Sequence, residues 1–321
     1  MQRWIGLVMR RALEHAEEYA RFMAGATRRP DPHAANPFAG MLPWDLNDSA
    51  MLEAPIADAK YSSELFDFTG IVLMRGAVDA SMAAAGRDAA NAHAAAIRRR
   101  VRDKTGRDPD EPHPGWRFHE AASRGPGRCD MRLHANDSHA AVGRLFDDTQ
   151  WAEGAAWLPL VRRALGSDCR LLWRGLVVSE PGAPEQAVHA DGVCSRSRWS
   201  ELTGHSPPAV LPCHALTVFV PLVDVGRNNG ATRFYPGTHQ TLWSAPALEA
   251  EAGEAGSSGG AGVAAVLDAS AGDAVVFDYR LFHAGGANVS SERRPLFYAT
   301  YARKWYDDEH NFPGRSHSLW R

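Results

Sequence analysis

The second half of the chain, from Cys169 onward, consists of short apolar runs that are separated by Pro, Gly and Asn. The runs are rich in β-branched and aromatic residues, which fit the pleated surface of a strand. Several strands at this spacing after a helical first half are typical of an antiparallel jelly roll or barrel. We therefore predict a mainly β fold with flanking helices that cover one face of the sheet. The runs are LLWRGLVV, HALTVFVPLVDV, ATRFYPG, VAAVLDA, DAVVFDYRLF and PLFYATYARKWY.

The first half of the chain carries longer helical signals. An apolar run after a Gly turn predicts a strand over residues 71–74, and an alanine-rich segment predicts a helix from about 80 to 103. A long polar stretch follows over residues 104–130. A second helix is expected over residues 151–165, because Gly166 is a favoured residue just past a helix end.

The ends of the chain differ in composition from its centre. Residues 1–60 predict an N-terminal helix followed by an extended arm rich in Pro, Asn, Asp and Ala, so the compact domain is expected over 61–321. Residues 245–262 have the low-complexity composition of a flexible surface loop. The aromatic segment over residues 301–321 is expected to pack back on the barrel or to cover it.

The composition excludes several functions. A chain of 321 residues that is 45% hydrophobic can bury a large core, and its formal net charge of −3 gives no basic field for nucleic acid. No run approaches the roughly 18 apolar residues of a membrane helix. Because no C-x-x-C pair is present, a zinc ribbon or redox motif is not indicated, and a reducing, cytoplasmic location fits. We therefore expect a small-molecule substrate, and neither nucleic acid nor a membrane as a partner.

The stretch QAVHADGV contains the first candidate ligands, His189 and Asp191. Alternate residues of a strand point to the same side, so this spacing brings the imidazole and the carboxylate together. The triplet alone is weak, since the same spacing recurs by chance in a helical segment at His15 and Glu17. A third candidate, His283, ends a later apolar strand. Two histidines and one carboxylate can occupy one face of an octahedral Fe(II), so these three predict an iron site.

A charged anchor follows the third ligand. If the electron source of such an oxygenase is a 2-oxo acid, its distal carboxylate needs a cation, and arginine binds carboxylates with two charge-assisted hydrogen bonds. Arg294 lies 294 − 283 = 11 residues after His283, on the next apolar run. One step along a strand reverses the side-chain direction, so Arg293 would point outward if Arg294 points inward. We favour Arg294 as the anchor.

Four segments in order resemble the phytanoyl-CoA dioxygenase-like group of Fe(II)/2-oxoglutarate-dependent oxygenases. Together they span residues 62–301, and the ordered set is much more specific than any single triplet. The segments are FDFTGIVLMRGAV, VVSEPGAPEQAVHADG, LTVFVPLVDVGRNNGATRFYPGTH and GDAVVFDYRLFHAGGANVSSERRPL. The resemblance implies a double-stranded β-helix fold and a dioxygenase that uses Fe(II), 2-oxoglutarate and O₂.

Residue by residue, the resemblance makes His189, Asp191 and His283 the iron ligands and Arg294 the partner of the C5 carboxylate of 2-oxoglutarate. Members of the family often have a serine two residues after the distal histidine that helps to bind the co-substrate. Here that position is Gly285, so another hydroxyl is expected to substitute for the serine. The candidates are Thr217 and Tyr298.

Asp191 also bears on the type of reaction. Halogenases related to this group have a small residue at the carboxylate position, which frees a coordination site for chloride. The aspartate therefore favours hydroxylation or a similar oxidation.

Two turn residues have structural interpretations. His239 follows a Pro-Gly turn and resembles a family signature, and a role in fixing that turn is expected. Asn229 and Gly230 form a hairpin signal of the type I′ kind, in which both central residues take positive φ.

A rival interpretation is a non-redox jelly roll, either an isomerase or hydrolase or a ligand-binding sensor. The same three ligands can hold zinc or nickel, and the usual order of affinities favours those metals over Fe(II). Arg294 distinguishes the two, because a non-redox metal site has no need of a carboxylate anchor after its distal ligand.

Overall fold

The computed structural model describes residues 52–110, 115–133, 142, 145–147, 149–192, 212–240, 265–308, 311 and 317–320. The predicted N-terminal helix and the 245–262 insertion lie outside these residues.

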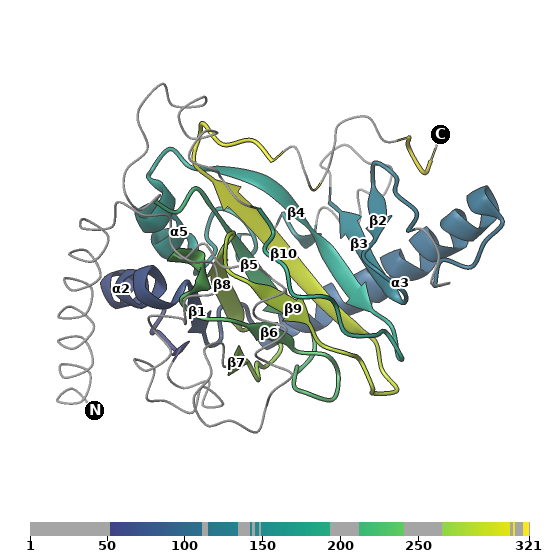
Figure 1. The fold of residues 1–321 in the computed structure, drawn as a ribbon, viewed down its shortest axis with the longest axis horizontal. Helices are drawn as coiled ribbons and strands as arrows, with labels where there is room; N and C mark the ends of the chain where they lie inside the picture. The colour runs from purple at the N-terminus through teal and green to yellow at the C-terminus, as the bar shows by residue number, and fades with distance from the viewer. Residues whose placement is uncertain are drawn as a thin grey trace, which may run out of the picture.

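Two antiparallel sheets form the framework of the fold (Figure 1). The large sheet has seven strands and the small sheet has three, which confirms the prediction of a mainly β jelly roll, the double-stranded β-helix. The large sheet has the order β1 (Ile71–Met74), β8 (Ala274–Asp278), β5 (Ala215–Pro221), β10 (Arg294–Ala302), β4 (Arg170–Ser179), β3 (Arg128–Arg132) and β2 (Ala121–Ser123). The small sheet has the order β7 (Ala265–Val266), β6 (Thr232–Phe234) and β9 (His283–Gly285).

The two sheets face each other across a small apolar core. Ile71 and Phe277 of the large sheet are fully buried in one cluster with Phe234 and Ala265 of the small sheet. Burial of such side chains removes apolar surface from water and holds the sheets together.

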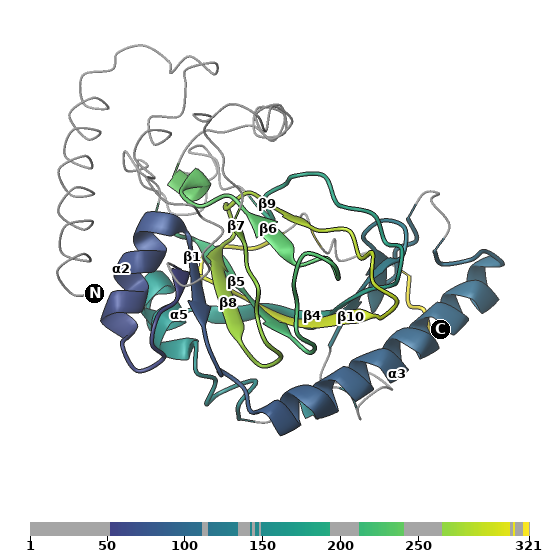
Figure 2. The same ribbon diagram turned by 90° about the horizontal axis from the view of Figure 1, so that it is seen from below.

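The helices lie on the opposite face of the large sheet, as predicted (Figure 2). They are α2 (Ala59–Thr69), α3 (Ala80–Thr105) and α5 (Leu158–Leu165). The aromatic ring of Phe297 on β10 stacks on Phe146, with centroids 5.0 Å apart, and meets Trp151 edge to face at 4.9 Å. Stacked and edge-to-face arrangements are the favourable ones for aromatic pairs. The main core of the protein therefore lies between this sheet and its helices.

Side-chain alternation along β10 separates this core from the interior of the jelly roll. Phe297, Ala299 and Tyr301 belong to the core under the helices. The alternate residues, which include Arg294 and Tyr298, project to the inner face, because successive side chains of a strand point to opposite sides. The inner face is therefore polar along part of its length.

Two elements differ from their sequence-based predictions. The second helix begins at Leu158 and not at residue 151, because Pro159 lies in its first turn, where the missing amide hydrogen costs nothing. The polar stretch 104–130 contains β2 and most of β3. Aspartate is depleted in strands, so the alternation of charged residues with Cys129 and Met131 does not by itself predict a strand.

The turn at Asn229 and Gly230 is not of type I′. Gly230 has φ of 81°, but Asn229 has no positive φ. Its side chain instead accepts a hydrogen bond from the Gly226 amide at 2.9 Å and donates to the Asp224 carbonyl at 2.7 Å. These bonds stabilise a wider loop than a two-residue hairpin.

The ends of the described chain pack against the domain. Leu52 is only 2% exposed and lies in the core between the sheets. At the other end, Tyr306 is buried and Leu319 belongs to the core under the helices. The C-terminal segment therefore packs back on the barrel.

The end of helix α2 depends on Gly70, which has φ of 76° and lies against His239. Nε2 of His239 donates a hydrogen bond to the Asp67 carbonyl at 3.2 Å, and burial lowers the pKa of His239 to about 4. A Cβ atom at Gly70 would lie 2.4 Å from Nδ1 of His239. His239 therefore fixes the turn after β6 to helix α2, which agrees with its predicted structural role.

The Gly70→Ala variant is expected to lose stability in urea denaturation. Gly76 is a matched control, because it has φ of 63° but no atom within 4 Å of an added Cβ. Left-handed backbone alone costs a non-glycine residue about 1 kcal/mol, so Gly76→Ala should lose that much and Gly70→Ala at least about 2 kcal/mol. Equal losses would show that the contact with His239 adds nothing.

Candidate metal centre

Backbone pairing places the two histidines on the same side. The His189 amide donates to the His283 carbonyl at 2.9 Å, and the His283 amide donates to the His189 carbonyl at 2.8 Å. Directly opposed residues of an antiparallel pair project from the same face. The centroids of the two imidazole rings accordingly lie 4.5 Å apart.

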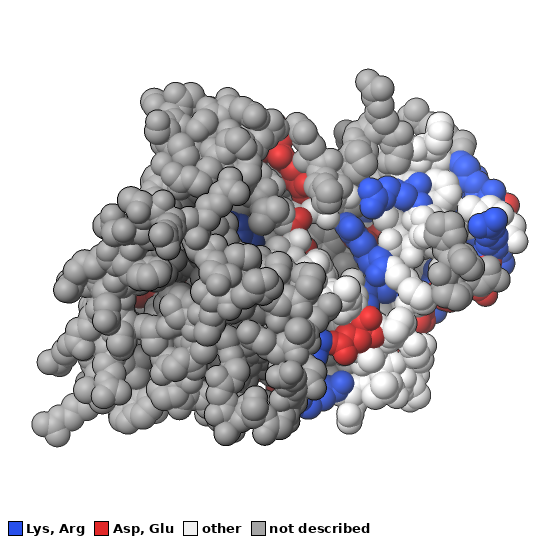
Figure 3. All heavy atoms as spheres, in the orientation of Figure 1, with Lys and Arg blue, Asp and Glu red and all other residues white. Residues whose placement is uncertain are grey.

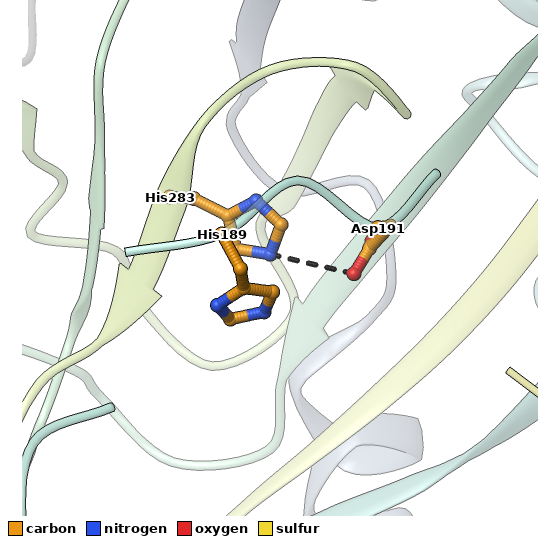
Figure 4. Close-up of side chains that lie close together, drawn as sticks. All are labelled: His189, Asp191 and His283. Atoms are coloured by element: carbon orange, nitrogen blue, oxygen red, sulfur yellow. Dashed lines mark ion pairs between the residues drawn. The ribbon is translucent and has the colours of Figure 1, made fainter. Parts of the chain in front are cut away.

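Asp191 completes the cluster, as predicted from its spacing. Its Oδ1 lies 3.6 Å from Nε2 of His283, and one ligand atom from each of the three residues lies within 4.8 Å of the others. Figure 4 shows the carboxylate and the His283 ring directed toward each other, with the His189 ring beside them. Three donors that converge in this way can hold one metal ion.

The backbone fixes the orientation of both rings. Nδ1 of His189 lies 2.8 Å from the Ala187 carbonyl, and Nδ1 of His283 lies 2.9 Å from the Leu281 carbonyl. A carbonyl can only accept, so each Nδ1 carries the hydrogen and each Nε2 presents a lone pair. Metal-ligating histidines commonly have such a second partner.

The cluster is closed on one side and open on the other. His283 packs against the rings of Phe277, Phe234 and Phe219, and its side chain is 4% exposed. Burial lowers the pKa of His283, an effect that the charge of Asp191 partly offsets, and this shift favours the neutral ring. The Asp191 side chain is 23% exposed, which makes its side of the cluster the accessible one.

The C-terminal segment holds the loop that carries Asp191. The side-chain amide of Asn311 donates to the Asp191 carbonyl at 2.8 Å, to the Tyr279 hydroxyl at 2.8 Å and to Asp308 at 3.0 Å. The Tyr279 hydroxyl in turn donates to Asp308. The sequence carries no local signal for these contacts, because 120 residues separate Asn311 from Asp191.

Arg294 projects into the jelly roll and Arg293 projects away from it. Arg294 is 3% exposed, and its Nε is buried with no hydrogen-bond partner among the described residues. Burial and the charge of Arg128 lower the pKa of Arg294 to about 9. Arg293 instead forms an ion pair with Glu180, with its Nε 2.8 Å from the carboxylate. The predicted alternation of the two arginines is therefore the observed one.

Arg294 lines a small apolar pocket beside the metal cluster. Arg294 lines it together with Phe219 and Phe234, whose rings also contact His283. A buried cation in an apolar pocket suits a ligand with a negatively charged group at that end.

The two hydroxyls predicted to substitute for a serine at Gly285 lie elsewhere. Thr217 bonds Thr300 at 3.1 Å between their hydroxyls, and Thr300 is six residues from Arg294 (300 − 294), or about 20 Å along the strand. The Tyr298 hydroxyl donates to Asp130 at 2.9 Å. Strand register therefore separates Thr217 from Arg294, which corrects the expectation that it takes the place of the serine.

The groups beside Gly285 are Gln186 and Arg128. The Gln186 side-chain carbonyl accepts the Gly285 amide at 3.2 Å, and a Cβ atom at Gly285 would lie 2.4 Å from that oxygen and 3.5 Å from Cζ of Arg128. Neither residue was singled out from the sequence, because Arg128 lies in the polar stretch that was not interpreted as a strand.

On the face in Figure 3, the Lys and Arg side chains gather over β2, β3 and the end of α3.

The two-sheet fold and the His-Asp-His cluster together define a jelly-roll protein with a candidate metal site. A model of the family described as phytanoyl-CoA dioxygenase (PhyH) matches residues 66–296, which is more than half of the 321 residues. The chain therefore belongs to the phytanoyl-CoA dioxygenase (PhyH) family, as its four motifs indicated.

Several known proteins are similar to the chain. Dioxygenase af480 of Aspergillus fumigatus is 27% identical over 192 residues, which cover 57% of this chain and 55% of the relative. The chain spans about half the length of the curated relatives it matches. No helix in the described part of the chain is long and apolar enough to cross a membrane.

Two solved structures share the fold. AviO1 from Streptomyces viridochromogenes has a TM-score of 0.52 at 20% identity, over 78% of this chain and 97% of that one. SnoN, a non-heme alpha-ketoglutarate-dependent epimerase from nogalamycin biosynthesis, has a TM-score of 0.50 at 20% identity, over 83% and 91%.

Proposed function

We propose that the chain is an Fe(II)- and 2-oxoglutarate-dependent dioxygenase that hydroxylates a C–H bond of a small molecule and releases succinate and CO₂. The observation that carries this proposal is the combination of two features linked by shared aromatic residues. His189, Asp191 and His283 have convergent side chains, and the pocket lined by Phe219 and Phe234, whose rings lie against His283, also contains Arg294, whose buried Nε has no hydrogen-bond partner among the described residues.

The donor set suits iron. Two neutral imidazoles and one carboxylate form the facial set of non-heme Fe(II) oxygenases, which leaves positions open for co-substrate and O₂. The hydrogen bonds from each Nδ1 to a backbone carbonyl hold Nε2 of His189 and of His283 toward the cluster. The rings therefore need little rearrangement to bind a metal.

Arg294 supports 2-oxoglutarate as the co-substrate. A buried cation without a carboxylate partner is unfavourable. The presence of Arg294 at a buried position therefore indicates that an anionic ligand binds there. Arginine binds a carboxylate through two parallel hydrogen bonds, which would fix the C5 end of 2-oxoglutarate and direct its 2-oxo acid end toward the cluster.

The aromatic rings around His283 determine access to the cluster. Phe219, Phe234 and Phe277 exclude water from the buried side of His283. The primary substrate would then approach on the exposed side, next to Asp191. Bound iron would supply the oxidising chemistry with O₂. The chain positions the substrate and excludes water from the site.

Proteins similar to the chain differ in the reactions that their names state. One relative is named a dioxygenase, and a structural neighbour is an epimerase. Asp191 supports hydroxylation, since its carboxylate occupies the position that would otherwise be free for a halide. Mass spectrometry of a converted substrate would distinguish the outcomes, because hydroxylation adds one oxygen atom and epimerisation adds none.

The purified protein with Fe(II) and O₂ is expected to convert 2-oxoglutarate to succinate slowly even without its primary substrate. The same protein loaded with Ni(II) should give no succinate, because nickel in this ligand set does not activate O₂. Succinate is measured by mass spectrometry. Retention of iron with no succinate formed would favour a non-redox metal protein.

A further inference from the structure

Two buried arginines lie on either side of one residue of β4. Arg128 on β3 and Arg294 on β10 are each paired with Ser179, from its two sides. Opposed residues of an antiparallel sheet share a face, so both guanidinium groups project to the inside of the jelly roll. Arg128 is 4% exposed and Arg294 is 3% exposed.

Neither arginine has an ion-pair partner within the part of the chain that the structure describes. Arg128 donates only to neutral oxygens: the Pro184 carbonyl at 3.2 Å, the Gly286 carbonyl at 2.9 Å and the Ser179 hydroxyl at 3.5 Å. Other arginines do have carboxylate partners, for example Arg124 with Asp130. The charge of the pair is therefore uncompensated.

Without a bound anion, the charged forms of the two arginines are disfavoured. Burial lowers the pKa of Arg128 to about 10, and burial together with the charge of Arg128 lowers the pKa of Arg294 to about 9. Like charges in a buried site repel, and a bound anion between them would remove that repulsion.

Arg128 lies where the serine of the family would stand. A Cβ atom at Gly285 would be 3.5 Å from Cζ of Arg128, so the guanidinium lies beside the missing hydroxyl. The Gln186 side chain fills the remaining space, 2.4 Å from the same Cβ position. The guanidinium of Arg128 therefore lies next to the position where the family has a serine and this chain has Gly285.

We propose that Arg128 binds the C5 carboxylate of 2-oxoglutarate together with Arg294, with Ser179 between them, in place of the family's serine. The inference rests on the proposed function and deepens it. Two cations around one carboxylate select for a co-substrate with a distal negative charge and against 2-oxo acids with an apolar tail.

The test measures binding, not turnover. The full-length Fe(II) protein is titrated without oxygen with 2-oxoglutarate and with 2-oxopentanoate, which has the same chain length but no C5 carboxylate. The Arg128→Gln variant is expected to bind 2-oxoglutarate about 10-fold to 100-fold more weakly, since a charged hydrogen bond contributes about 1.5–3 kcal/mol. Its affinity for 2-oxopentanoate should be unchanged or higher.

A matched control is Arg293→Gln, which removes the neighbouring arginine that pairs with Glu180 outside the pocket. It should bind both acids as the wild type does. Equal weakening of both acids by Arg128→Gln would mean that Arg128 only supports the structure, and unchanged binding of 2-oxoglutarate would also overturn the proposal.

Two further results separate the possible failures. If Arg128→Gln does not fold, Arg128→Lys keeps the charge but loses the fork, and it should weaken 2-oxoglutarate severalfold without affecting 2-oxopentanoate. Equal affinity of this variant and the wild type for 2-oxoglutarate would overturn the role of Arg128. Failure of the wild-type Fe(II) protein to bind either acid would instead refute the proposed function.

Discussion

The Asp191→Ala variant is expected to lose iron-dependent turnover while it keeps its fold. Asp191 supplies the only carboxylate of the cluster, and its side chain is partly exposed, so the fold does not depend on it. The loop is held through the Asp191 backbone carbonyl by Asn311, a bond that the substitution preserves. Loss of a residue that only hydrogen-bonds to a metal ligand weakens metal binding by up to about 100-fold. Loss of a direct ligand should therefore weaken Fe(II) binding by at least about 100-fold.

The measurement compares Fe(II) affinity, succinate formation and circular dichroism of the variant and the wild type. Asp307→Ala serves as a control, because Asp307 is an exposed carboxylate that pairs with Arg170 away from the cluster. The control should retain the iron affinity of the wild type. A variant at Asp191 that consumed 2-oxoglutarate at the normal rate would count against the ligand assignment.

The Arg294→Gln variant is expected to bind 2-oxoglutarate at least about 100-fold more weakly, because a buried, bidentate, charge-assisted contact contributes about 3 kcal/mol. Iron binding itself should be unchanged, because Arg294 is not one of the three residues of the metal cluster. Titration of the iron-loaded protein with 2-oxoglutarate measures the loss. Unchanged affinity for 2-oxoglutarate would mean that another residue anchors it.

The same variant should be more stable than the wild type when no ligand is bound. Removal of a buried, unpaired charge beside a second arginine relieves both desolvation and repulsion, so the free energy of unfolding should rise by about 1 kcal/mol or more. Urea denaturation of the metal-free proteins tests this. A less stable variant would show that Arg294 has a structural partner beyond the residues described.

The fold could be predicted largely from the sequence, since β-branched and aromatic runs between turn residues gave the strands of the second half. The strand β3 was missed because Arg128 and Asp130 face the interior of the jelly roll, where polar residues serve a site and not a core. Strand alternation also predicted that Arg294 and Arg293 face opposite sides. The pattern is reliable where the inward face of a strand is apolar and fails where that face carries charged residues, as in β3.

The metal cluster was accessible from the sequence and its supports were not. His189 and Asp191 share a local spacing, and His283 ends a recognisable strand. In contrast, the contact of Asn311 with the Asp191 carbonyl joins residues that are 120 positions apart, and only the folded chain brings them together. The same holds for Arg128, which lies in the large sheet but is close to Gly285 in the small sheet.

The most direct test of the central claim is an anaerobic titration of the metal-free protein with Fe(II) and 2-oxoglutarate, followed by visible absorption. The proposed function predicts a weak metal-to-ligand charge-transfer band that appears only when both are present and is lost or weakened in Arg294→Ala. Binding of Fe(II) without that band would contradict the claim and would favour a non-redox metal protein with the same fold.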